Sequence, residues 1–340
     1  MNLLIITQKV DEEDQLLGFF VDWLTRFSAK FEKVTVICQK SGRFNLPANI
    51  EVVSIGKDRG LLKASQLFNF YSAIIGRRKD YDAVFVHMNP IWVVLGGWWW
   101  RISGKMIYFW YTHKAVTPKL RLAEKLANTV FTASKESFRL ASSKVIVTGH
   151  GIDTDLFRPD YSKKLAGLNI LSVGRIAPVK NYETLIHAAS LLKNKGILFS
   201  VTIIGEPALE SDKDYEAAIK KMIKELQLED NFKFLGKVNH RDILPYYQSH
   251  DIFVHMSKTG SVDKTLLEAM ACGMKVLSSN DSAKSFLPDR LIFNNENPAE
   301  LADKIENMSH EQPDPALRSY VAANHNLNTL INKMSDIING

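Results

Sequence analysis

The sequence is poor in cysteine. Its 340 residues include two, Cys38 and Cys272, and both stand in apolar runs. Two cysteines give no sign of an oxidising compartment, and without a CxxC pair or a histidine cluster they exclude a structural zinc site. We therefore interpret both as small buried hydrophobic side chains.

The sequence also lacks a long uncharged apolar run. Its most apolar stretch, 91–110, is interrupted by Arg101 and Lys105, whereas a membrane-spanning helix needs about 20 predominantly apolar residues. We expect a helix over Ile91–Ile102, followed by a strand. The consecutive tryptophans 98–100 cannot all face one core, so exposure at a membrane interface or an acceptor groove and packing in the core both stay open.

No basic leader or small-residue cleavage site precedes the first apolar run, which favours a first strand over a signal peptide and predicts a cytoplasmic protein. Residues 1–160 carry 22 lysines and arginines against 15 acidic residues, whereas the remainder carries 21 against 22. This imbalance is compatible with a solvated basic face, and also with an anionic acceptor or peripheral contact with the inner membrane face. No nucleic-acid partner is expected.

Short β-branched runs alternate with longer helical stretches such as 15–30, 61–78 and 118–127. This order predicts an α/β protein with two doubly wound, Rossmann-like domains, 1–160 and 161–340, joined by the polar segment 160–167. We expect the domains to face a central cleft and the last helix to pack back on the first domain. Strands are expected at Leu3–Thr7, Val34–Cys38, Ala83–His87, Lys105–Trp110, Val145–Val147, Asn169–Val173, Phe199–Ile204, Phe232–Leu235, Ile252–His255 and Lys275–Ser278.

Two cations follow the first predicted strand of the second domain. Gly174 permits a tight turn, and Arg175 and Lys180 flank the short loop that follows. Asn181 is placed to cap the next helix. Cations beside a helix N-terminus, at the carboxyl edge of a parallel sheet, suit a diphosphate group. Surface cations usually bind no ligand, so the interpretation depends on their position after a core strand.

A second loop, Ser257–Ser261, joins a buried strand to a helix. Its small residues offer backbone amides to an anion, and Lys264 adds positive charge. Asp263 is placed to cap the helix. Glu268 is the lone acid of the apolar run 266–273, where a carboxylate is out of place unless it binds something. We expect it to accept both hydroxyls of a ribose.

At this point the chain resembles the retaining family-four glycosyltransferases of the GT-B fold. The resemblance is specific over residues 165–310 and looser in the first half. It is carried by Gly174-Arg175 with Lys180, by Leu235-Gly236 with Leu244-Pro245-Tyr246-Tyr247, by Leu267-Glu268-Ala269-Met270-Ala271-Cys272-Gly273, and in the first half by Gly18 and by Gly149-His150-Gly151-Ile152-Asp153.

The resemblance implies that Arg175 and Lys180 bind the donor diphosphate and that Glu268 binds the ribose. It places the base at the loop after Gly236, and it places His113 opposite the donor sugar, although a lone histidine after a strand is more often structural. The catalytic residues are then His113, Arg175 and Lys180, and the donor-binding residues are Gly18, Gly174, Lys237, Val238, Thr259, Gly260, Ser261, Asp263, Lys264, Thr265 and Glu268.

The chain departs from the family pattern at Gly260, where the first glutamate of a Glu-x7-Glu motif would stand. In the family this glutamate holds sugar hydroxyls. We expect either Asp263 or the loop amides to take over that role, and slightly favour Asp263.

The activity expected is transfer of a hexose from a nucleoside-diphosphate sugar to a hydroxyl of a glycan or lipid-linked glycan. Retention is implied by the family alone. We expect no metal and no cofactor, because the Asp-x-Asp triplets 80–82 and 153–155 do not follow strand ends. A non-catalytic nucleotide-sugar-binding protein and a GT-B epimerase or hydrolase are the alternatives. No G-x-G-x-x-G follows either first strand, which disfavours a dehydrogenase.

Overall fold

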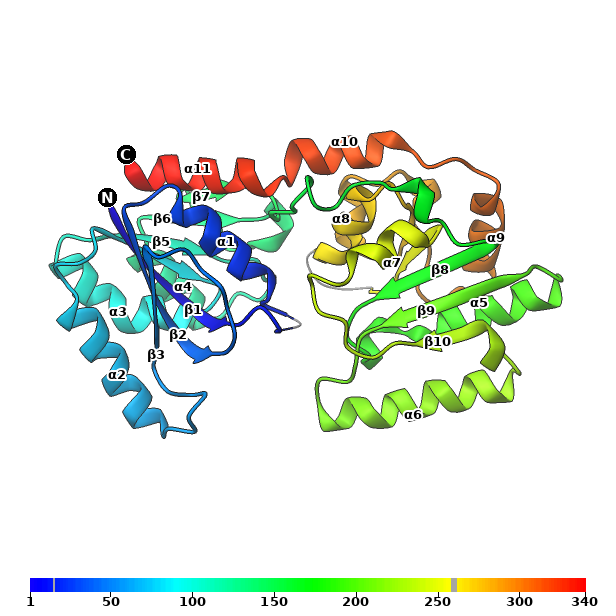
Figure 1. Cartoon of the computed structure of the whole chain (residues 1–340), viewed down its shortest axis with the longest axis horizontal. Helices are drawn as coiled ribbons and strands as arrows, with labels where there is room; N and C mark the ends of the chain where they lie inside the picture. The colour runs from blue at the N-terminus through cyan, green and yellow to red at the C-terminus, as the bar shows by residue number, and fades with distance from the viewer. Residues whose placement is uncertain (15, 258–261) are drawn as a thin grey trace. The chain divides into compact units, whose positions relative to one another are not determined.

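The computed structural model describes residues 1–14, 16–257 and 262–340, and the chain forms two compact units (Figure 1). The first comprises 1–151 and 325–340, and the second comprises 152–324. The boundary predicted at residue 160 therefore lies too late along the chain. The physical reason is that Ile152 and Phe157 already pack in the core of the second unit.

The first unit is built on a parallel sheet whose described strands run in the order β3-β2-β1-β4-β5-β6-β7. This is the order of a Rossmann-type sheet, in which the direction of strand addition reverses between β1 and β4. The strands are β1 (Asn2–Val10), β2 (Lys33–Ser41), β3 (Ile50–Ser54), β4 (Ala83–His87), β5 (Met106–Trp110), β6 (Thr129–Thr132) and β7 (Val145–Val147).

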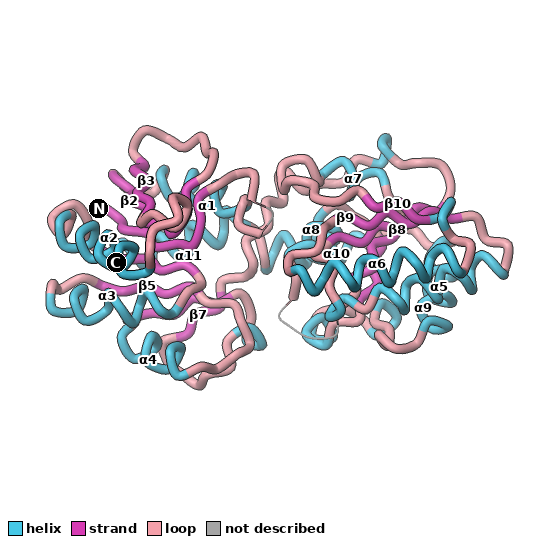
Figure 2. Tube along the Cα trace, turned by 90° about the horizontal axis from the view of Figure 1, so that it is seen from below, coloured by secondary structure: helices cyan, strands magenta, loops and turns pink. Residues whose placement is uncertain are grey.

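Helices cover both faces of this sheet (Figure 2). Along β1, Leu3 and Ile5 pack in one core while Leu4 and Ile6 pack in the other, as the alternation of side chains along a strand requires. The first core contains α1 (Phe19–Ser28) and α11 (Leu327–Asn339), and the second contains α2 (Lys63–Gly76), α3 (Pro90–Ile102) and α4 (Pro118–Leu126).

The second unit holds a parallel sheet whose described strands run in the order β10-β9-β8-β11-β12. The direction of strand addition reverses between β8 and β11, which is where folds of this kind bind their ligands. The strands are β8 (Leu168–Val173), β9 (Phe199–Ile204), β10 (Phe232–Phe234), β11 (Ile252–His255) and β12 (Lys275–Ser278).

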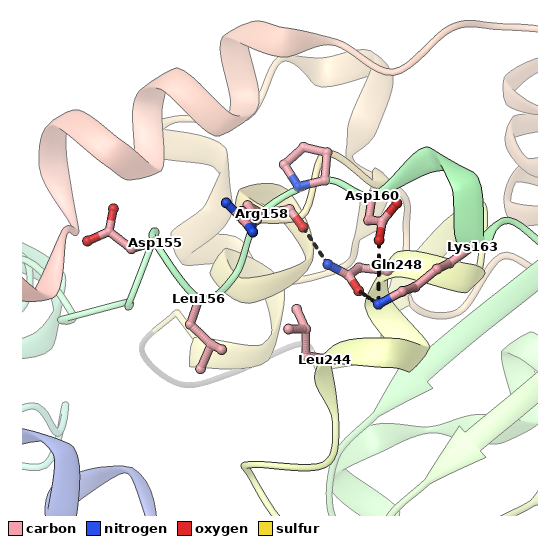
Figure 3. Close-up of a pocket in the computed structure, with 8 residues that line it drawn as sticks. Asp155, Leu156, Arg158, Asp160, Lys163, Leu244 and Gln248 are labelled. Atoms are coloured by element: carbon pink, nitrogen blue, oxygen red, sulfur yellow. Dashed lines mark hydrogen bonds and ion pairs between the residues drawn. The ribbon is translucent and has the colours of Figure 1, made fainter.

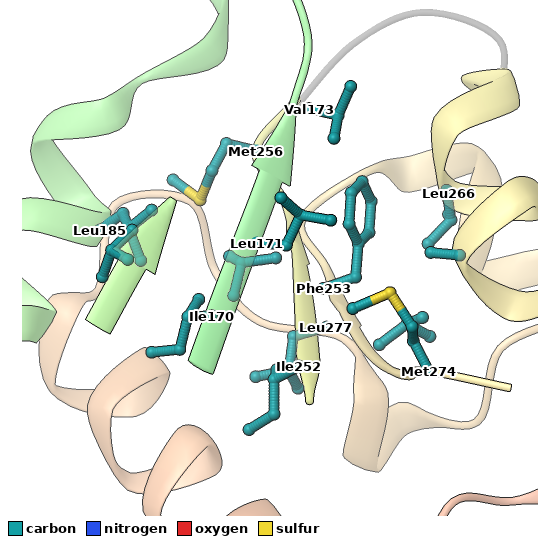
Figure 4. Packing of buried hydrophobic residues seen from close by; sticks show 14 of the residues in the cluster. Ile170, Leu171, Val173, Leu185, Ile252, Phe253, Met256, Leu266, Met274 and Leu277 are labelled. Atoms are coloured by element: carbon teal, nitrogen blue, oxygen red, sulfur yellow. The ribbon is translucent and has the colours of Figure 1, made fainter. Parts of the chain in front are cut away.

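One contiguous core holds this unit together (Figure 4). Leu171 of β8 and Phe253 of β11 are fully buried, as is Leu266 of the helix that follows β11. The helices of this unit are α5 (Tyr182–Asn194), α6 (Glu210–Glu225), α7 (Leu244–Ser249), α8 (Lys264–Ala271), α9 (Pro298–Ser309) and α10 (Pro315–Asn324). Short 3-10 turns in the described part of the chain are Lys135–Ser137 in the first unit and Tyr161–Lys163, Pro178–Lys180, Glu229–Asn231, Asp281–Ser285 and Asp289–Leu291 in the second.

The predicted α/β class with two Rossmann-like domains is confirmed. Strands β3 and β6 were not expected from the sequence. Of the consecutive tryptophans of α3, Trp98 is 60% exposed and Trp100 is fully buried in the core, so core packing holds for Trp100. Residue 15, the expected start of the first helix, lies outside the described residues, and α1 begins at Phe19. Within the described residues, no helix combines the length and apolarity needed to cross a bilayer.

Candidate functional site

Three glycines with positive φ follow adjacent strands at the carboxyl edge of the second sheet: Gly174 after β8, Gly205 after β9 and Gly236 after β10. A Cβ atom on Gly205 would lie 2.0 Å from the carbonyl oxygen of Gly174, so no other residue fits there. Backbone bonds tie these turns together, with Gly205 N donating to Gly236 O at 2.8 Å. The edge is therefore a close-packed backbone surface.

Both predicted diphosphate cations lie at this edge. Arg175 is exposed and forms no hydrogen bond or ion pair with any described residue. Lys180 is mostly buried, and its Cε and Nζ atoms lie over Gly174, at 3.3 and 3.4 Å from the place that a Cβ would occupy. The structure thus brings both cations to the loop after β8.

Lys180 reaches across the sheet edge to Asp263, with Nζ donating to Oδ2 at 2.6 Å. His255, at the end of β11, shares that oxygen through Nε2 at 2.9 Å. Burial opposes ionisation of Asp263, but the hydrogen bond from His255 and the charge of Lys180 outweigh it and hold the pKa of this carboxyl well below its usual 3.8.

Two expected helix caps are absent. Asp263 stands at the N-cap position of α8 but makes no side-chain cap bond, because its carboxylate is turned toward Lys180 and His255. Asn181 precedes α5 without capping it, since its amide donates to Asn295 O and Thr184 Oγ1. The capping predictions for these two residues were wrong.

Glu268 is buried in α8, as predicted, and both of its oxygens have partners. Tyr247 of α7 donates its hydroxyl hydrogen to Oε2 at 2.9 Å, and His240 Nε2 lies 3.2 Å from Oε1. Burial opposes ionisation, yet the bonds to His240 and Tyr247 and the charge of Lys264 hold the pKa of Glu268 below its usual 4.5. Glu268 is therefore a carboxylate at neutral pH.

The other expected donor-binding residues of this unit lie around α8 and the loop after β10. Thr265 Oγ1 is buried and has no hydrogen-bond partner among the described residues, which is unusual for a buried hydroxyl. Lys237 is exposed, and Val238 packs on the core. Thr259, Gly260 and Ser261 lie outside the described residues.

Two expected residues belong to the first unit. Gly18 precedes α1, and a Cβ there would lie 2.6 Å from the carbonyl oxygen of Asp14, so local packing alone requires glycine. His113 is exposed in the loop after β5, where its Nδ1 accepts a hydrogen bond from the amide of Ala115 at 3.1 Å. Their roles in donor binding stay predictions.

Sequence reasoning missed His240, Tyr247 and His255. His240 lies in the loop before α7, Tyr247 on α7 and His255 on β11, and no regular sequence spacing relates them to the carboxylates they contact. The one available signal was indirect, because a buried acid needs hydrogen-bond donors and aromatic or histidine side chains supply them.

A cavity of about 410 Å³ lies beside α7 (Figure 3). It is lined by Asp155, Leu156, Arg158, Pro159, Asp160, Lys163, Leu244 and Gln248. The predicted linker contacts α7 beside this cavity, since Lys163 Nζ donates to Gln248 Oε1 at 3.1 Å. None of the predicted donor-binding residues lines this cavity, so we place the candidate site at the sheet edge, where the charged groups converge.

Within the described ranges, no group of three or more His, Cys, Asp or Glu side chains is arranged to hold a metal ion. The sequence contains a third Asp-x-Asp triplet, 212–214, beyond the two considered above. Asp212 of this triplet accepts a hydrogen bond from the amide of Leu209 at the start of α6, which is a capping role.

Comparisons with known proteins bear on both units. Relatives include the amylovoran biosynthesis glycosyltransferase AmsK of Erwinia amylovora, 34% identical over 42% of this chain and 35% of its own. Another is the putative colanic acid biosynthesis glycosyltransferase WcaL of Escherichia coli, 29% identical over 40% and 34% of the two chains. The chain thus spans about a third of the length of these curated relatives.

The whole fold has counterparts among solved structures. The crystal structure of Anabaena HepE in complex with UDP superimposes with a TM-score of 0.80 over 100% of both chains, at 17% identity. Its complex with UDP-glucose gives a TM-score of 0.78 over 100% of this chain and 99% of HepE, also at 17% identity. These likenesses show a GT-B fold. The family described as glycosyl transferases group 1 matches residues 153–325, more than half of the sequence, and the chain therefore belongs to the group 1 glycosyl transferases.

Proposed function

We propose that this glycosyltransferase moves a hexose from a nucleoside-diphosphate sugar to a hydroxyl acceptor, with retention and without a metal ion. The observation that carries the proposal is the placement of Arg175 and Lys180 after β8, beside the position where the order of strands reverses. Ligands of doubly wound sheets bind at that position, and two cations there suit a diphosphate.

The surroundings of the two cations support a nucleotide rather than a simple anion. Glu268 is an ionised, buried carboxylate whose oxygens are held by Tyr247 and His240, and a carboxylate so placed can accept ribose hydroxyls. Thr265 adds a buried hydroxyl with no partner among the described residues. HepE, which shares the fold, is known in complexes with UDP and UDP-glucose.

The chemical task is to stabilise the departing diphosphate while positive charge develops on the sugar. Arg175 presents a planar fork of donors that matches phosphate oxygens, and Lys180 supplies a second positive charge. Asp263 holds Lys180 in place before the reaction, and a cation that is fixed in advance stabilises charge as it forms in the transition state. In this proposal the two cations take the place of a metal, and His113 contacts the donor sugar.

For the acceptor we propose a glycan or lipid-linked glycan of the cell envelope. The names of two relatives, in amylovoran and colanic acid biosynthesis, support this class. Peripheral contact with an anionic membrane is supported by the basic first half of the chain and by exposed Phe68 and Trp98, on two helices that cover the same sheet face. Phe68→Ser and Trp98→Ser should reduce sedimentation with anionic vesicles, and equal sedimentation of wild type and both variants would contradict this contact.

A thermal-shift panel of UDP-, GDP-, ADP- and TDP-sugars tests the donor assignment, because a ligand that binds only the folded state raises the melting temperature. One nucleotide class should stabilise the protein, and stabilisation by none of them would overturn the proposal. Hydrolysis of the stabilising donor without acceptor then separates the alternatives. A transferase releases sugar slowly to water, a non-catalytic binding protein releases none, and an epimerase converts the donor into its epimer.

A further inference from the structure

A series of hydrogen-bond contacts crosses the carboxyl edge of three adjacent strands, β8, β11 and β12, in the second unit. Lys180, after β8, donates to Asp263 Oδ2 at 2.6 Å, and His255 Nε2 at the end of β11 lies 2.9 Å from the same oxygen. On its other side, His255 Nδ1 lies 3.0 Å from Ser278 Oγ at the end of β12. These contacts connect Lys180, a cation of the proposed donor site, to the buried Ser278.

The hydrogen bonds determine which nitrogen of His255 carries the proton. The ionised Asp263 carboxylate can only accept a hydrogen bond, so His255 Nε2 carries the hydrogen that it shares with Oδ2. In the neutral ring Nδ1 is then the acceptor and receives a hydrogen bond from the Ser278 hydroxyl, whose oxygen also accepts the amide hydrogen of Asn280 at 3.2 Å. Burial, the largest effect, lowers the pKa of His255, which keeps the ring neutral. Asp263 thus has a neutral donor that does not depend on Lys180.

In this arrangement the charge of Lys180 is already compensated. Among the described residues, Asp263 is its one ion-pair partner, and the Lys180 side chain is 13% exposed. A diphosphate that binds Lys180 must lie within a few ångströms of the Asp263 carboxylate. Two like charges at such a separation repel each other appreciably in a partly desolvated site.

We propose that Asp263 is a resident counter-anion of Lys180 that competes with the diphosphate of the donor and of the released nucleotide. This inference rests on the proposed function. His255 keeps a hydrogen bond on Asp263 when Lys180 turns to a diphosphate, so the carboxylate is never left buried without a partner. The competition weakens binding of the nucleoside diphosphate product and favours its release.

Two other roles for Asp263 make different predictions. Capping of α8 does not apply, because the side chain accepts no bond from the first turn of that helix. Replacement of the missing family glutamate as a sugar ligand would act on the sugar alone. A counter-anion acts on the diphosphate, which the nucleotide sugar and the free nucleotide share. Comparing these two ligands therefore separates the roles.

The test is calorimetric titration of the full chain with UDP, GDP, ADP and TDP, and with the UDP-, GDP-, ADP- or TDP-sugar that matches the nucleotide bound. Asp263→Asn is the decisive variant, because one amide oxygen can still accept from both Lys180 and His255 while the charge is lost. The Kd of the nucleoside diphosphate should fall by about 3- to 30-fold, and the Kd of the sugar nucleotide by a similar factor. The control is Asp303→Asn, which removes a carboxylate that pairs with Lys195 on other elements and should leave both Kd values unchanged.

The variant Lys180→Met separates a failure of the proposed donor site from a failure of the counter-anion role of Asp263. It should raise the Kd of the nucleoside diphosphate by about tenfold or more. If Lys180→Met binds as wild type, or if wild type binds none of the four nucleotides, the donor site is wrong and the inference is wrong with it. If Lys180→Met weakens binding but Asp263→Asn leaves the nucleotide Kd unchanged or raises it, the inference alone is overturned. Weaker binding of the sugar nucleotide only would identify Asp263 as a sugar ligand. Melting temperatures of all variants verify folding.

Discussion

Tyr247 donates the hydrogen of its phenol to Glu268 Oε2 at 2.9 Å, so the one acidic side chain of α8 is held by the neighbouring helix α7. His240 contacts the other oxygen at 3.2 Å. A buried carboxylate is costly unless donors satisfy it, and these two side chains lower that cost. They also fix the orientation of the carboxylate.

Tyr247→Phe should therefore weaken both the fold and the donor site. Loss of a hydrogen bond to a buried charged group costs about 1–3 kcal/mol of unfolding free energy. We also expect a higher Kd for the nucleotide, because Glu268 loses its orientation. Denaturant unfolding and nucleotide titration measure the two effects. Tyr246→Phe is the matched control, since the Tyr246 hydroxyl bonds to no described residue. Equal behaviour of both variants would show that the contact is dispensable.

Arg175→Ala and Lys180→Ala should each lower turnover while the melting temperature stays close to that of wild type. If the two side chains stabilise the leaving diphosphate, each loss raises the barrier by about 2–4 kcal/mol. Arg175→Lys should also be impaired, because a point charge does not replace a bidentate fork. Lys195→Ala, which removes a lysine paired with Asp303 elsewhere in the unit, serves as the control. Near-normal rates in Arg175→Ala and Lys180→Ala would remove the diphosphate assignment.

The first unit should lose stability as the pH falls from about 6.5 to 4. Burial lowers the pKa of His325 from 6.5 to about 4, and its Nδ1 accepts a hydrogen bond from the amide of His150. Between these values the unfolded chain binds the proton and the folded chain does not, so acid favours unfolding. The full shift corresponds to about 3 kcal/mol.

Tryptophan fluorescence measures this unit selectively, because all six tryptophans lie between residues 23 and 110. His325→Asn keeps an acceptor for His150 but cannot titrate. Its stability should depend less on pH over the same window. An identical dependence in wild type and His325→Asn would show that His325 is not the titrating group.

The sequence predicted the layers of the fold better than the contacts of the site. Alternation of apolar runs is a local signal, so the strands of the second unit were found close to their observed positions. In the short strands β3 and β6 the apolar residues are few and are interrupted or flanked by polar ones, Glu51 in β3 and two threonines in β6, so their local signal is weaker. The unit boundary depends on where Phe157 packs, and that is decided by residues far along the chain.

The same limit applies to the candidate site. Arg175, Lys180 and Glu268 stand out because each is a charge beside a core element. Asp263 was expected to cap α8, which is the common role of an aspartate before a helix. Its actual partners, Lys180 and His255, lie on other elements, and no spacing along the chain reveals such a contact.

In the proposed reaction the second unit binds a nucleoside-diphosphate sugar and helps to break the bond between its diphosphate and the sugar without a metal. The most direct measurement is release of nucleoside diphosphate from the stabilising sugar nucleotide in excess EDTA, by wild type and by Arg175→Ala. The account predicts steady release by wild type and a loss of about 30-fold or more in the variant. It is contradicted if wild type releases nothing until magnesium is added, or if both proteins release nucleotide at the same rate.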